Sequence, residues 1–369
     1  MAGSEQTAAG SDQPAADAAG PGRDLPRTPV LADVAERAGV SQQTVSRVVR
    51  GSPVVARRTR ERVEQAIAEL GYRPNAAARA LVTRRSHRIG VVATTTAVYG
   101  PTMVLQGVQE AARAAGYSVS LVMVTDLAPE AVTDAFEELH AQSVEGVVAV
   151  VPEDASQHAV QTAGALVPCV LAPGLDGDGV PDAYWAELAA ARTATAHLLR
   201  LGHRTVHHIA GPQDWAESRA RATGWRTALV EAGRPVPHPA RGDWTAAGGH
   251  AAGHELLAAG ATAVFAASDH MAIGVVRAAA ERGLVVPDDV SVVGYDDVPE
   301  AAYLNPPLTT VRQDFTEIGR RCVQVLLRRL ASQEVPAGRD DLALVVRAST
   351  GPPPAPARRT PAPRHGARA

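Results

Sequence analysis

The sequence predicts a small all-α head followed by an α/β body built on parallel sheets. Residues 30–72 contain short helical patterns and no convincing strand. From residue 87 onward, short runs of Val, Ile and Ala alternate with helical stretches. Continuous apolar strands that alternate with helices are typical of βαβ units, in which helices cover a buried parallel sheet.

The expected elements of the body follow from this alternation. Strands are expected near 88–94, 118–124, 146–151, 168–172, 205–210, 262–267 and 291–294. Helices are expected at 101–115, 184–201, 216–232, 245–259 and 269–282. Residues 1–27 are rich in Ala, Gly and Pro, and residues 349–369 in Pro and Arg, so both ends are expected to be disordered tails.

Length and composition limit the class of protein. A chain of 369 residues with 46% hydrophobic residues can build two or three domains with real cores. No apolar run reaches the roughly 18 residues of a membrane helix, and the N-terminal residues lack a secretory-type apolar stretch. Cys169 and Cys322 form no CxxC pair, so neither a disulfide framework nor a cysteine zinc site is expected. We therefore expect a protein of a bacterial-type cytoplasm.

The charge is distributed unevenly along the chain. Between Arg27 and Arg88, thirteen arginines face five acidic residues, a net charge of +8. The whole chain carries −3, so the remaining residues carry −11. A basic segment joined to an acidic body is the asymmetry of a nucleic-acid reader with a separate second domain.

Two helical patterns around Gly39 open the head. One face of the first helix is apolar, at Leu31, Val34, Ala35 and Ala38. Gly39 can adopt the left-handed conformation that ends this helix, and Ser41 is a good N-cap for the next.

The second helix, whose apolar face is Val45, Val48 and Val49, shows polar side chains on its other side. These outward side chains are Gln42, Gln43, Ser46, Arg47 and Arg50. Such a helix suits the major groove of DNA, where Arg pairs with guanine and Gln with adenine. A surface helix hairpin with a solvated polar face would show the same spacing.

A third helix is predicted over 54–72, with Val63, Ile67 and Leu70 inward. Three arginines crowd its first turn, at Arg57, Arg58 and Arg60. Cations there oppose the helix dipole, a cost that nearby phosphates would explain.

Two longer motifs resemble a known family. "DVAERAGVSQQTVSRVV" (33–49) and "YRPNAAARALVTRRSHRIG" (72–90) resemble the LacI family of regulators, as does the order of everything over residues 30–348. The family's first helix often begins with a Thr or similar cap. Here Val30 stands at that position, so the cap could have moved to Thr28 or be missing.

The resemblance implies a fold for each part of the chain. It places a helix-turn-helix DNA-binding domain at 28–73 and a hinge helix or linker at 74–86. The rest, 87–348, resembles an effector-binding and dimerisation domain of the periplasmic-binding-protein-like α/β type. Such a domain has two doubly wound subdomains, and the chain crosses between them three times.

The resemblance also implies DNA contacts at individual positions. Gln42, Gln43 and Arg47 match the positions at which the family reads bases. Ser41, Thr44 and Asn75 match positions that usually contact phosphate. Further contacts are expected from Ser46, Arg50, Arg79 and Leu81.

Leu81 stands where paired hinge helices of the family insert a leucine into the minor groove, which unstacks a base step and bends DNA. A segment so short is unstable alone, so its folding should await DNA. An ordinary interdomain packing role for Leu81 is the alternative.

Effector contacts are expected at the carboxyl ends of strands, where such folds bind ligands. The expected residues are Thr94, Arg221, Trp244, Ser268, Asp296 and Phe315. Arg221 matches the family's clamp on sugar hydroxyls, and Asp296 matches a hydroxyl acceptor. Trp244 and Phe315 offer apolar faces for a sugar ring.

Plainer interpretations exist for the same residues. Arg221 and Asp296 could simply form an interdomain ion pair, and Trp244 and Phe315 could be plain core residues. For Trp225, packing is favoured over ligand contact. No metal site is expected, because the spacing of three nearby histidines suits no common one: His203, His207 and His208.

The identity of the sugar stays open at this stage. "RGDW" (241–244) and "NPPLTTVRQDF" (305–315) look nearest to lactose-type repressors, which hints at a galactoside or related glycoside. Two departures weaken the hint. Pro173 stands where those repressors have an acid, and Ser268 stands where they often have Asn.

Taken together, the sequence predicts a homodimeric, sequence-specific repressor of carbohydrate-utilisation genes. A small sugar would release it from near-palindromic operator DNA, with inducer action favoured over corepressor action and no cofactor required. Dimer contacts are expected from 101–115. The Pro-rich tail offers no leucine-repeat helix of the kind that builds tetramers, so a dimer is expected.

Two other classes of protein fit the sequence less well. A sugar-binding protein without a regulatory role does not explain residues 30–88. An α/β enzyme would need a G-x-S-x-G elbow, a P-loop or a Rossmann glycine fingerprint, none of which occurs. The adjacent acids Asp296 and Asp297 would point to different sides of a turn, which makes them poor acid/base partners.

Overall fold

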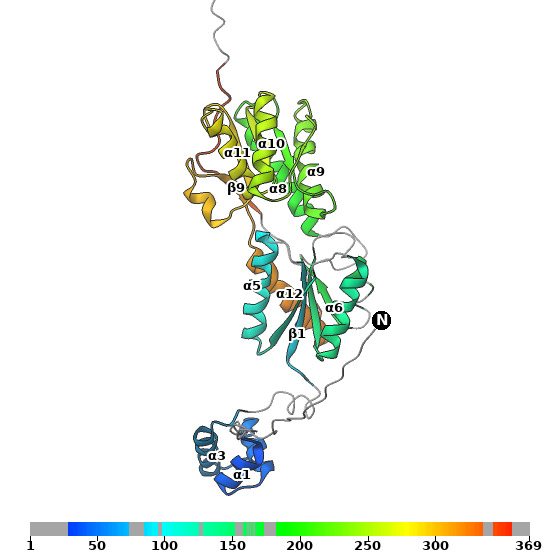
Figure 1. Cartoon of the computed structure of the whole chain (residues 1–369), viewed down its shortest axis with the longest axis vertical. Coiled ribbons are helices and arrows are strands. Elements are labelled where there is room, and N and C mark those ends of the chain that lie inside the picture. Colours follow the sequence, from blue (N-terminus) through cyan, green and yellow to red (C-terminus); the bar gives the residue numbers. More distant parts are fainter. Residues whose placement is uncertain are drawn as a thin grey trace, which may run out of the picture. The chain divides into compact units, whose positions relative to one another are not determined.

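The chain divides into two compact units, Met1–Arg84 and Arg85–Ala369, which we call the head and the body. A computed structural model describes the following residues: 29–73, 85–94, 98–124, 128–151, 158–160, 162, 164, 167–172, 182–334 and 342–355. Figure 1 shows the head as a small group of helices and the body as helices packed on two sheets. No helix among the described residues is long and apolar enough to cross a membrane.

Three helices form the head, α1 (Leu31–Ala38), α2 (Gln42–Val49) and α3 (Arg57–Leu70). One side of each helix is apolar and faces the other two, as the spacing predicts. The buried side chains that hold them together are Val34, Ala35, Ala38, Val45, Val48, Val63, Ala66 and Tyr72. Because this core is small, the polar faces of all three helices stay accessible.

The ends of the helices differ in two details from the sequence prediction. The backbone N–H of Val30 donates to the Asp33 carboxylate (2.7 Å), so α1 has a stabilised start although Val30 has no capping side chain. The third helix begins at Arg57 and not at residue 54. Val54 and Val55 precede it, and the stiff β-branched side chain of Val55 packs against the head core outside the helix.

The first sheet of the body has four parallel strands in the order β2-β1-β3-β4. Its strands are β1 (Arg88–Thr94), β2 (Ser118–Val124), β3 (Gly146–Val150) and β4 (Cys169–Leu171). Helices α5 (Tyr99–Ala114) and α6 (Pro129–Ala141) belong to separate core clusters on its two faces. Alternate residues of β1 enter the two clusters, as expected of a strand buried on both sides.

The second sheet has six strands in the order β10-β9-β8-β7-β5-β6, all parallel to their neighbours except β10. Its strands are β5 (His207–Ala210), β6 (Ala240–Arg241), β7 (Ala263–Ala266), β8 (Ser291–Asp296), β9 (Thr309–Arg312) and β10 (Ala343–Val345). The helices packed around it are α8 (Asp182–Arg200), α9 (Ala216–Glu231), α10 (Ala246–Ala258) and α11 (Asp269–Glu281). A short 3-10 helix, η1 (Pro299–Tyr303), follows β8.

Helix α12 (Phe315–Leu330) joins the two halves of the body. It follows β9 of the second sheet but buries its apolar face in the core of the first sheet, through Ile318, Cys322, Val323 and Leu326. The later strand β10 returns to the second sheet. We call the two halves the first and second subdomains, and α12 belongs to the first.

The predicted fold class is confirmed, with every predicted strand and helix of the body present and its ends shifted by a few residues. The prediction did not include α6, α12, β6, β9, β10 and η1. Strands β6 and β10 have two and three residues, too few to show a period.

Glycines bring helices α10 and α11 into backbone contact. A Cβ on Gly249 would lie 2.2 Å from the carbonyl oxygen of Met271, and one on Gly274 would lie 2.2 Å from the carbonyl oxygen of Ala246. Both positions therefore exclude any side chain. The two helices cross more closely than helices with ordinary side chains at the contact could.

We predict that Gly249→Ala destabilises the body, although alanine is the better helix former by about 1 kcal/mol. The added methyl group meets backbone, so the helices must separate at a cost of about 1–3 kcal/mol. Urea unfolding followed by tryptophan fluorescence measures the difference. Ala247→Gly, at an exposed position of the same helix, is the control and should cost about 0.5–1 kcal/mol. A more stable Gly249→Ala variant would show that the close contact has been misjudged.

Candidate functional sites

The outward face of α2 carries the residues predicted to read DNA. Gln42, Gln43, Arg47 and Arg50 are exposed, while Val45 and Val48 on the other face are buried. Ser41 and Thr44 lie at the start of the helix, where the Ser41 hydroxyl accepts a hydrogen bond from the Thr44 N–H (3.2 Å). The helix therefore offers two amides and two guanidiniums to a partner without any change in its own packing.

Hydrogen bonds within the head fix the orientation of some of the groups predicted to bind DNA. The Arg50 guanidinium donates to the Ser46 hydroxyl (2.7 Å), which ties these two predicted DNA contacts together. Arg62 of α3 donates to the carbonyls of Ala38 (2.5 Å) and Gly39 (3.1 Å) and so fixes the turn before α2. The remaining predicted DNA contacts, Asn75, Arg79 and Leu81, lie outside the described residues.

Three arginines were expected to crowd the first turn of α3, and the structure shows how two of them are balanced. Arg57 forms an ion pair with Glu61 one turn later (2.8 Å). Arg60 donates to the backbone carbonyl of Ser52 (2.6 Å). Arg58 is exposed. The first turn of α3 therefore presents positive charge, while the contacts of Arg57 and Arg60 reduce the repulsion within the turn.

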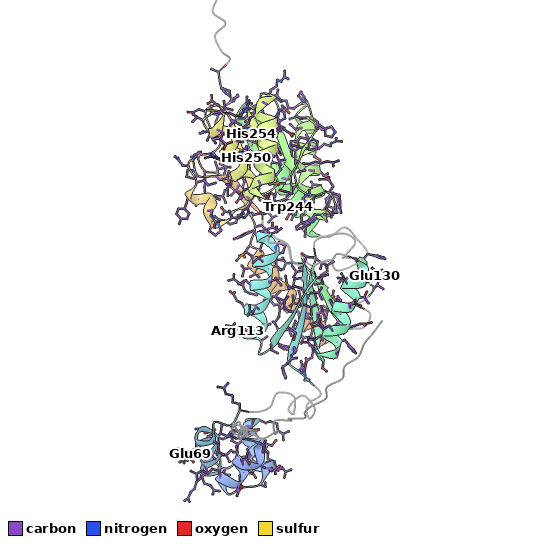
Figure 2. All side chains as sticks on the ribbon, in the orientation of Figure 1. Glu69, Arg113, Glu130, Trp244, His250 and His254 are labelled. Carbon is purple, nitrogen blue, oxygen red and sulfur yellow. The ribbon has the colours of Figure 1, made fainter. Side chains whose placement is uncertain are left out.

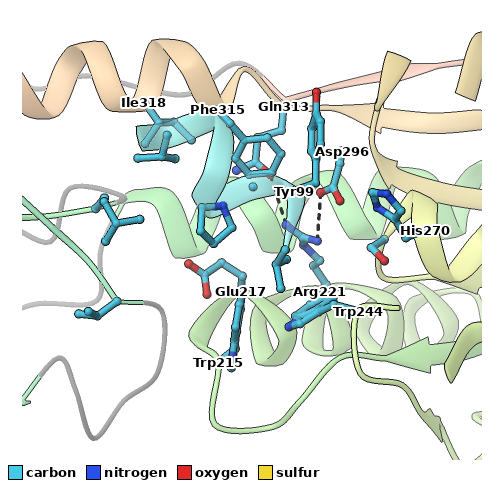
Figure 3. Close-up of a pocket in the computed structure, with 18 residues that line it drawn as sticks. Tyr99, Trp215, Glu217, Arg221, Trp244, His270, Asp296, Gln313, Phe315 and Ile318 are labelled. Carbon is cyan, nitrogen blue, oxygen red and sulfur yellow. Dashed lines mark hydrogen bonds and ion pairs between the residues drawn. The ribbon is translucent and has the colours of Figure 1, made fainter. Parts of the chain in front are cut away.

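A cavity that is partly open to solvent lies in the body, with about 700 Å³ of empty space when its open side is included (Figure 3). Residues of both subdomains line it, and most follow the carboxyl end of a strand. The lining residues used below are Tyr99, Trp215, Glu217, Arg221, Trp244, Ser268, His270, Asp296, Gln313 and Phe315. This is the place where doubly wound folds bind ligands.

Arg221 of α9 is the most extensively bonded side chain in the cavity. Its Nε donates to Glu187 of α8 (2.8 Å), and its Nη1 donates to the carbonyl oxygen of Ala267 (2.6 Å). A further Nη2 hydrogen bond reaches Gln313 (3.3 Å), and Nη1 lies 3.5 Å from Asp296. Arg221 is 4% exposed, and its charge could not remain buried without these acceptors.

The rings around Arg221 hold its plane. The guanidinium carbon lies 3.7 Å from the ring centroid of Tyr295 and 5.7 Å from that of Trp244. Burial opposes ionisation, but the carboxylates of Glu187 and Asp296 outweigh it and raise the pKa of Arg221 above its ordinary value. Arg221 therefore stays protonated and is fixed in one orientation. Figure 3 shows Arg221 between Asp296 and Trp244.

Two of the predicted effector contacts have an unusual backbone. Trp244 and Asp296 have φ angles of 69° and 111°, values that side-chain-bearing residues rarely adopt. Gly211 makes room for Trp244, because a Cβ there would lie 2.3 Å from the indole ring. Gly100 does the same for Phe315, whose ring would lie 2.7 Å from a Cβ. Strain of this kind tends to be retained where a side chain must face a ligand.

The structure brings five of the six predicted effector residues together and leaves one apart. Arg221, Trp244, Ser268, Asp296 and Phe315 line the cavity. Thr94 ends β1 and is buried, but it is not among the residues that line the cavity in the described part of the chain.

Ser268 has a structural contact that the sequence did not suggest, whereas Trp225 packs in the core as the sequence favoured. The Ser268 hydroxyl accepts a hydrogen bond from the Met271 N–H (3.2 Å) and caps α11 while it faces the cavity. Trp225 is 1% exposed, stacks on His208 and donates to the carbonyl of Val206 (2.9 Å). It belongs to the core of the second subdomain.

Glu217, which also lines the cavity, was not predicted from the sequence; it lies in the first turn of α9, one helical turn before Arg221. Its Oε2 atom is buried and has no hydrogen-bond partner among the described residues. Burial raises the pKa of Glu217 to about 7, above the ordinary value of 4.5. The i, i+4 spacing to Arg221 was the available signal, because both side chains then share a helix face.

The cavity also contains aromatic and polar side chains that the prediction did not name. Trp215 packs against Trp244 (centroids 5.3 Å apart), and Tyr99 meets Phe315 edge to face (5.8 Å). Gln313, which lines the cavity, donates to Glu187 behind it (2.9 Å), and both side chains accept hydrogen bonds from Arg221. Burial raises the pKa of Asp296 well above its ordinary value, against the opposing effect of Arg221.

Comparison with known proteins places these sites in context. Residues 30–75 match the bacterial regulatory proteins of the lacI family, and residues 195–350 match the periplasmic binding protein-like domain. The chain is 37% identical over 308 residues to the lactose operon repressor of Escherichia coli (strain K12), which covers 83% of this chain and 86% of that protein.

Two solved structures extend the comparison. The lac repressor dimer bound to operator and the anti-inducer ONPF aligns with a TM-score of 0.80 and 37% identity, over 88% of this chain and 100% of that one. The complex of the transcriptional regulator CelR with cellobiose aligns with a TM-score of 0.62 and 34% identity, over 87% and 99%.

A helix-turn-helix head on a periplasmic-binding-protein-like body defines a ligand-responsive DNA-binding regulator. The chain belongs to the LacI family of bacterial transcriptional regulators. The resemblance stated from the motifs of residues 33–49 and 72–90 is thereby confirmed.

We predict that Glu217→Gln stabilises the body in a pH-dependent way. The folded protein raises the pKa of Glu217 from 4.5 to about 7 and so binds more protons than the unfolded chain between these values. Wild-type stability therefore falls as the pH rises through this window, by up to about 3 kcal/mol, and the glutamine variant escapes this loss. Urea unfolding at pH 4 to 8 measures the difference between the two proteins. A difference that is constant across this range would contradict the prediction.

Proposed function

We propose that this protein is a homodimeric transcriptional repressor of carbohydrate-utilisation genes, which a small sugar releases from a near-palindromic operator. The observation that carries the proposal is the pairing, in one chain, of an exposed polar recognition helix with a cavity built around Arg221. The proposal assigns the chain no catalytic step, and it implies a place on the bacterial nucleoid.

The head supplies the DNA-binding half of the proposal. Arg47 and the two glutamines of α2 have the donors and acceptors that read guanine and adenine in the major groove. Ser41, Thr44, Ser46 and Arg50 surround them and are proposed to position the helix on phosphates. Two copies related by a two-fold axis would match the symmetry of a palindromic operator.

The segment after α3 stays a prediction, since it lies outside the described residues. We propose that Asn75 and Arg79 contact the DNA backbone and that Leu81 enters the minor groove. The lac repressor dimer, a relative over 88% of this chain, is bound to operator DNA. Its similarity supports the same use of the segment here.

The cavity supplies the effector-binding half. A sugar presents hydroxyl groups and weakly apolar C–H faces, and each hydroxyl that is buried needs a partner. Arg221 and Asp296 offer a fixed donor and a carboxyl group, while Trp244 and Phe315 offer flat apolar surfaces. CelR binds cellobiose, and the lac repressor is a relative over most of the chain. A glycoside, including a galactoside, is therefore the proposed effector class.

Ligand binding can reach the head because the cavity has walls from both subdomains. Tyr99 and Phe315 belong to the first subdomain, and Arg221 and Trp244 to the second. A ligand that touches both favours one relative position of the two, which would misalign the paired hinge segments. Coupling of about 1–3 kcal/mol is typical of such switches, and a complete release needs nearer 5 kcal/mol.

An edge strand of the body supports the dimer. Strand β2 lies at the end of the first sheet and exposes Leu121 by 50% and Met123 by 44%. Exposed apolar side chains on an edge strand favour association. We propose that β2 and the neighbouring helix α5 meet their copies in the partner.

Fluorescence anisotropy with labelled operator-like duplexes tests the proposal as a whole. A repressor should bind one sequence at nanomolar concentration and release it when a mono- or disaccharide is added. Binding of a sugar without any DNA affinity would favour a plain sugar-binding protein and would overturn the proposal.

We predict that Arg47→Ala weakens operator binding by about 1–3 kcal/mol and relaxes the base preference at one symmetric pair of positions. The reason for this expectation is that Arg47 is exposed on the outward face of α2. Anisotropy titrations against a set of single-base operator variants measure the preference. Arg234→Ala, which removes the same charge from an exposed site of the second subdomain, is the control. An equal loss on all sequences would mean that Arg47 contacts phosphate and not a base.

We predict that Arg221→Ala keeps operator affinity but abolishes the response to the sugar. Because this change leaves Glu187 buried without its cation, it could cost about 3–5 kcal/mol of stability. Asp296→Asn is the gentler second variant and should weaken sugar binding at least tenfold. Isothermal titration calorimetry and the release assay measure both, with Arg226→Ala on the exposed side of α9 as control. A normal response in both variants would remove this cavity from the mechanism.

A further inference from the structure

Three side chains on the second subdomain converge away from the cavity. His250 and His254 lie one turn apart on α10, and Glu281 is the last residue of α11. Figure 2 labels the two histidines next to each other on the second subdomain. All three side chains are about one-third exposed.

The distances among their polar atoms are short. The Nε2 atoms of His250 and His254 lie 3.2 Å apart, and both approach the same oxygen, Glu281 Oε2, at 2.8 and 2.9 Å. The imidazole rings are perpendicular, with an interplanar angle of 87°. One nitrogen of each ring and one carboxylate oxygen therefore point toward a common position.

The backbone contact between α10 and α11 makes this convergence possible. Gly249 and Gly253 on α10 and Gly274 on α11 allow the helices to approach closely. The histidines, at positions i and i+4, lie on one face of α10. Glu281 can then reach both rings from the end of α11.

The geometry matches the coordination sphere of a small ion. Zinc bonds to imidazole nitrogen at about 2.0–2.1 Å and to carboxylate oxygen at about 2.0–2.2 Å, so ligand atoms about 3 Å apart can share one ion. The three separations here are 2.8, 2.9 and 3.2 Å. The exposure of the side chains leaves room for water on the remaining positions.

The chemistry of the three groups also suits a cation. Glu281 supplies a carboxylate oxygen, and His250 and His254 each supply an imidazole nitrogen. Imidazole and carboxylate together favour divalent first-row transition metals over Mg²⁺ and Ca²⁺, which prefer oxygen ligands alone.

We propose that His250, His254 and Glu281 form a surface binding site for a divalent transition-metal ion such as Zn²⁺. The ion bonds to two imidazole Nε2 atoms and one carboxylate oxygen, with water on its outer side. By connecting α10 to α11 it stabilises the second subdomain. The sequence prediction of no metal site weighed His203, His207 and His208 and did not consider this pair.

Arg277 contacts the same carboxylate through its other oxygen. Arg277 Nε donates to Glu281 Oε1 at 2.7 Å, while the histidines approach Oε2. Arg277 thus holds Glu281 in place and leaves Oε2 directed at the two imidazoles, although its charge opposes a nearby cation.

Metal binding to the untagged full-length protein tests the proposal. Co²⁺ titration followed by visible absorption and Zn²⁺ binding by equilibrium dialysis are the two measurements. We expect one ion per chain at this site. His250→Ala and His254→Ala should each weaken binding at least about 100-fold, since even outer-shell changes cost 10–100-fold. His238→Ala, an exposed histidine elsewhere, is the matched control and should leave affinity unchanged.

Thermal unfolding gives the second readout. Zn²⁺ should raise the Tm of the wild-type protein and of the His238→Ala variant but not that of the His250→Ala variant, whereas Mg²⁺ and Ca²⁺ should raise none of them. The proposal fails if Co²⁺ or Zn²⁺ does not bind below millimolar concentration. It also fails if binding persists in both histidine variants, because the metal would then be bound elsewhere. Operator and sugar binding are not needed for either readout.

Discussion

A buried cation organises the effector cavity. Arg221 is 4% exposed and would be too costly to bury without its acceptors, of which Glu187 is the strongest. These acceptors come from α8, from the end of β7 and from the residue after β9, so the charge requires all three elements to meet at one point. Such a pair adds little net stability, but it fixes where the donors of Arg221 point. The shape of the cavity follows from this fixed position.

The other polar groups of the cavity are held in a state ready for a ligand. Asp296 accepts only weakly from Arg221, at 3.5 Å, and burial raises the pKa of its carboxyl group. Glu217 has a buried oxygen that lacks a partner among the described residues. The cavity therefore contains carboxyl groups whose hydrogen bonds are incomplete, which costs free energy in the absence of a ligand. Hydroxyl groups of a bound sugar would complete them.

The fold and most of the cavity could be predicted from sequence because they depend on local patterns and strand ends. Asp296 ends β8, a strand that the sequence predicts, so the alternation of strands and helices places it at one edge of the sheet. Trp244 follows β6, which is too short to show a period, and was predicted from the motif "RGDW". Glu217 and Glu187 were not predicted as site residues. From the sequence, an acidic residue in a polar helix turn is expected to face solvent, and only tertiary packing shows that it is buried. No pattern in the sequence predicts the left-handed φ of Trp244. Nor does any pattern show that Gly211, 33 residues earlier, makes room for its indole ring. The contact of His250 and His254 with Glu281 depends on how closely two helices approach, which no single-helix pattern reveals.

A crystal structure of the body with the tightest-binding sugar from a mono- and disaccharide panel would show directly whether the cavity around Arg221 holds the effector. We expect sugar hydroxyls within about 3.2 Å of Arg221 and of Asp296, with the Arg221–Glu187 pair unchanged and a sugar face on Trp244 or Phe315. A sugar bound outside this cavity would contradict this expectation. So would a complex in which Arg221 has left Glu187.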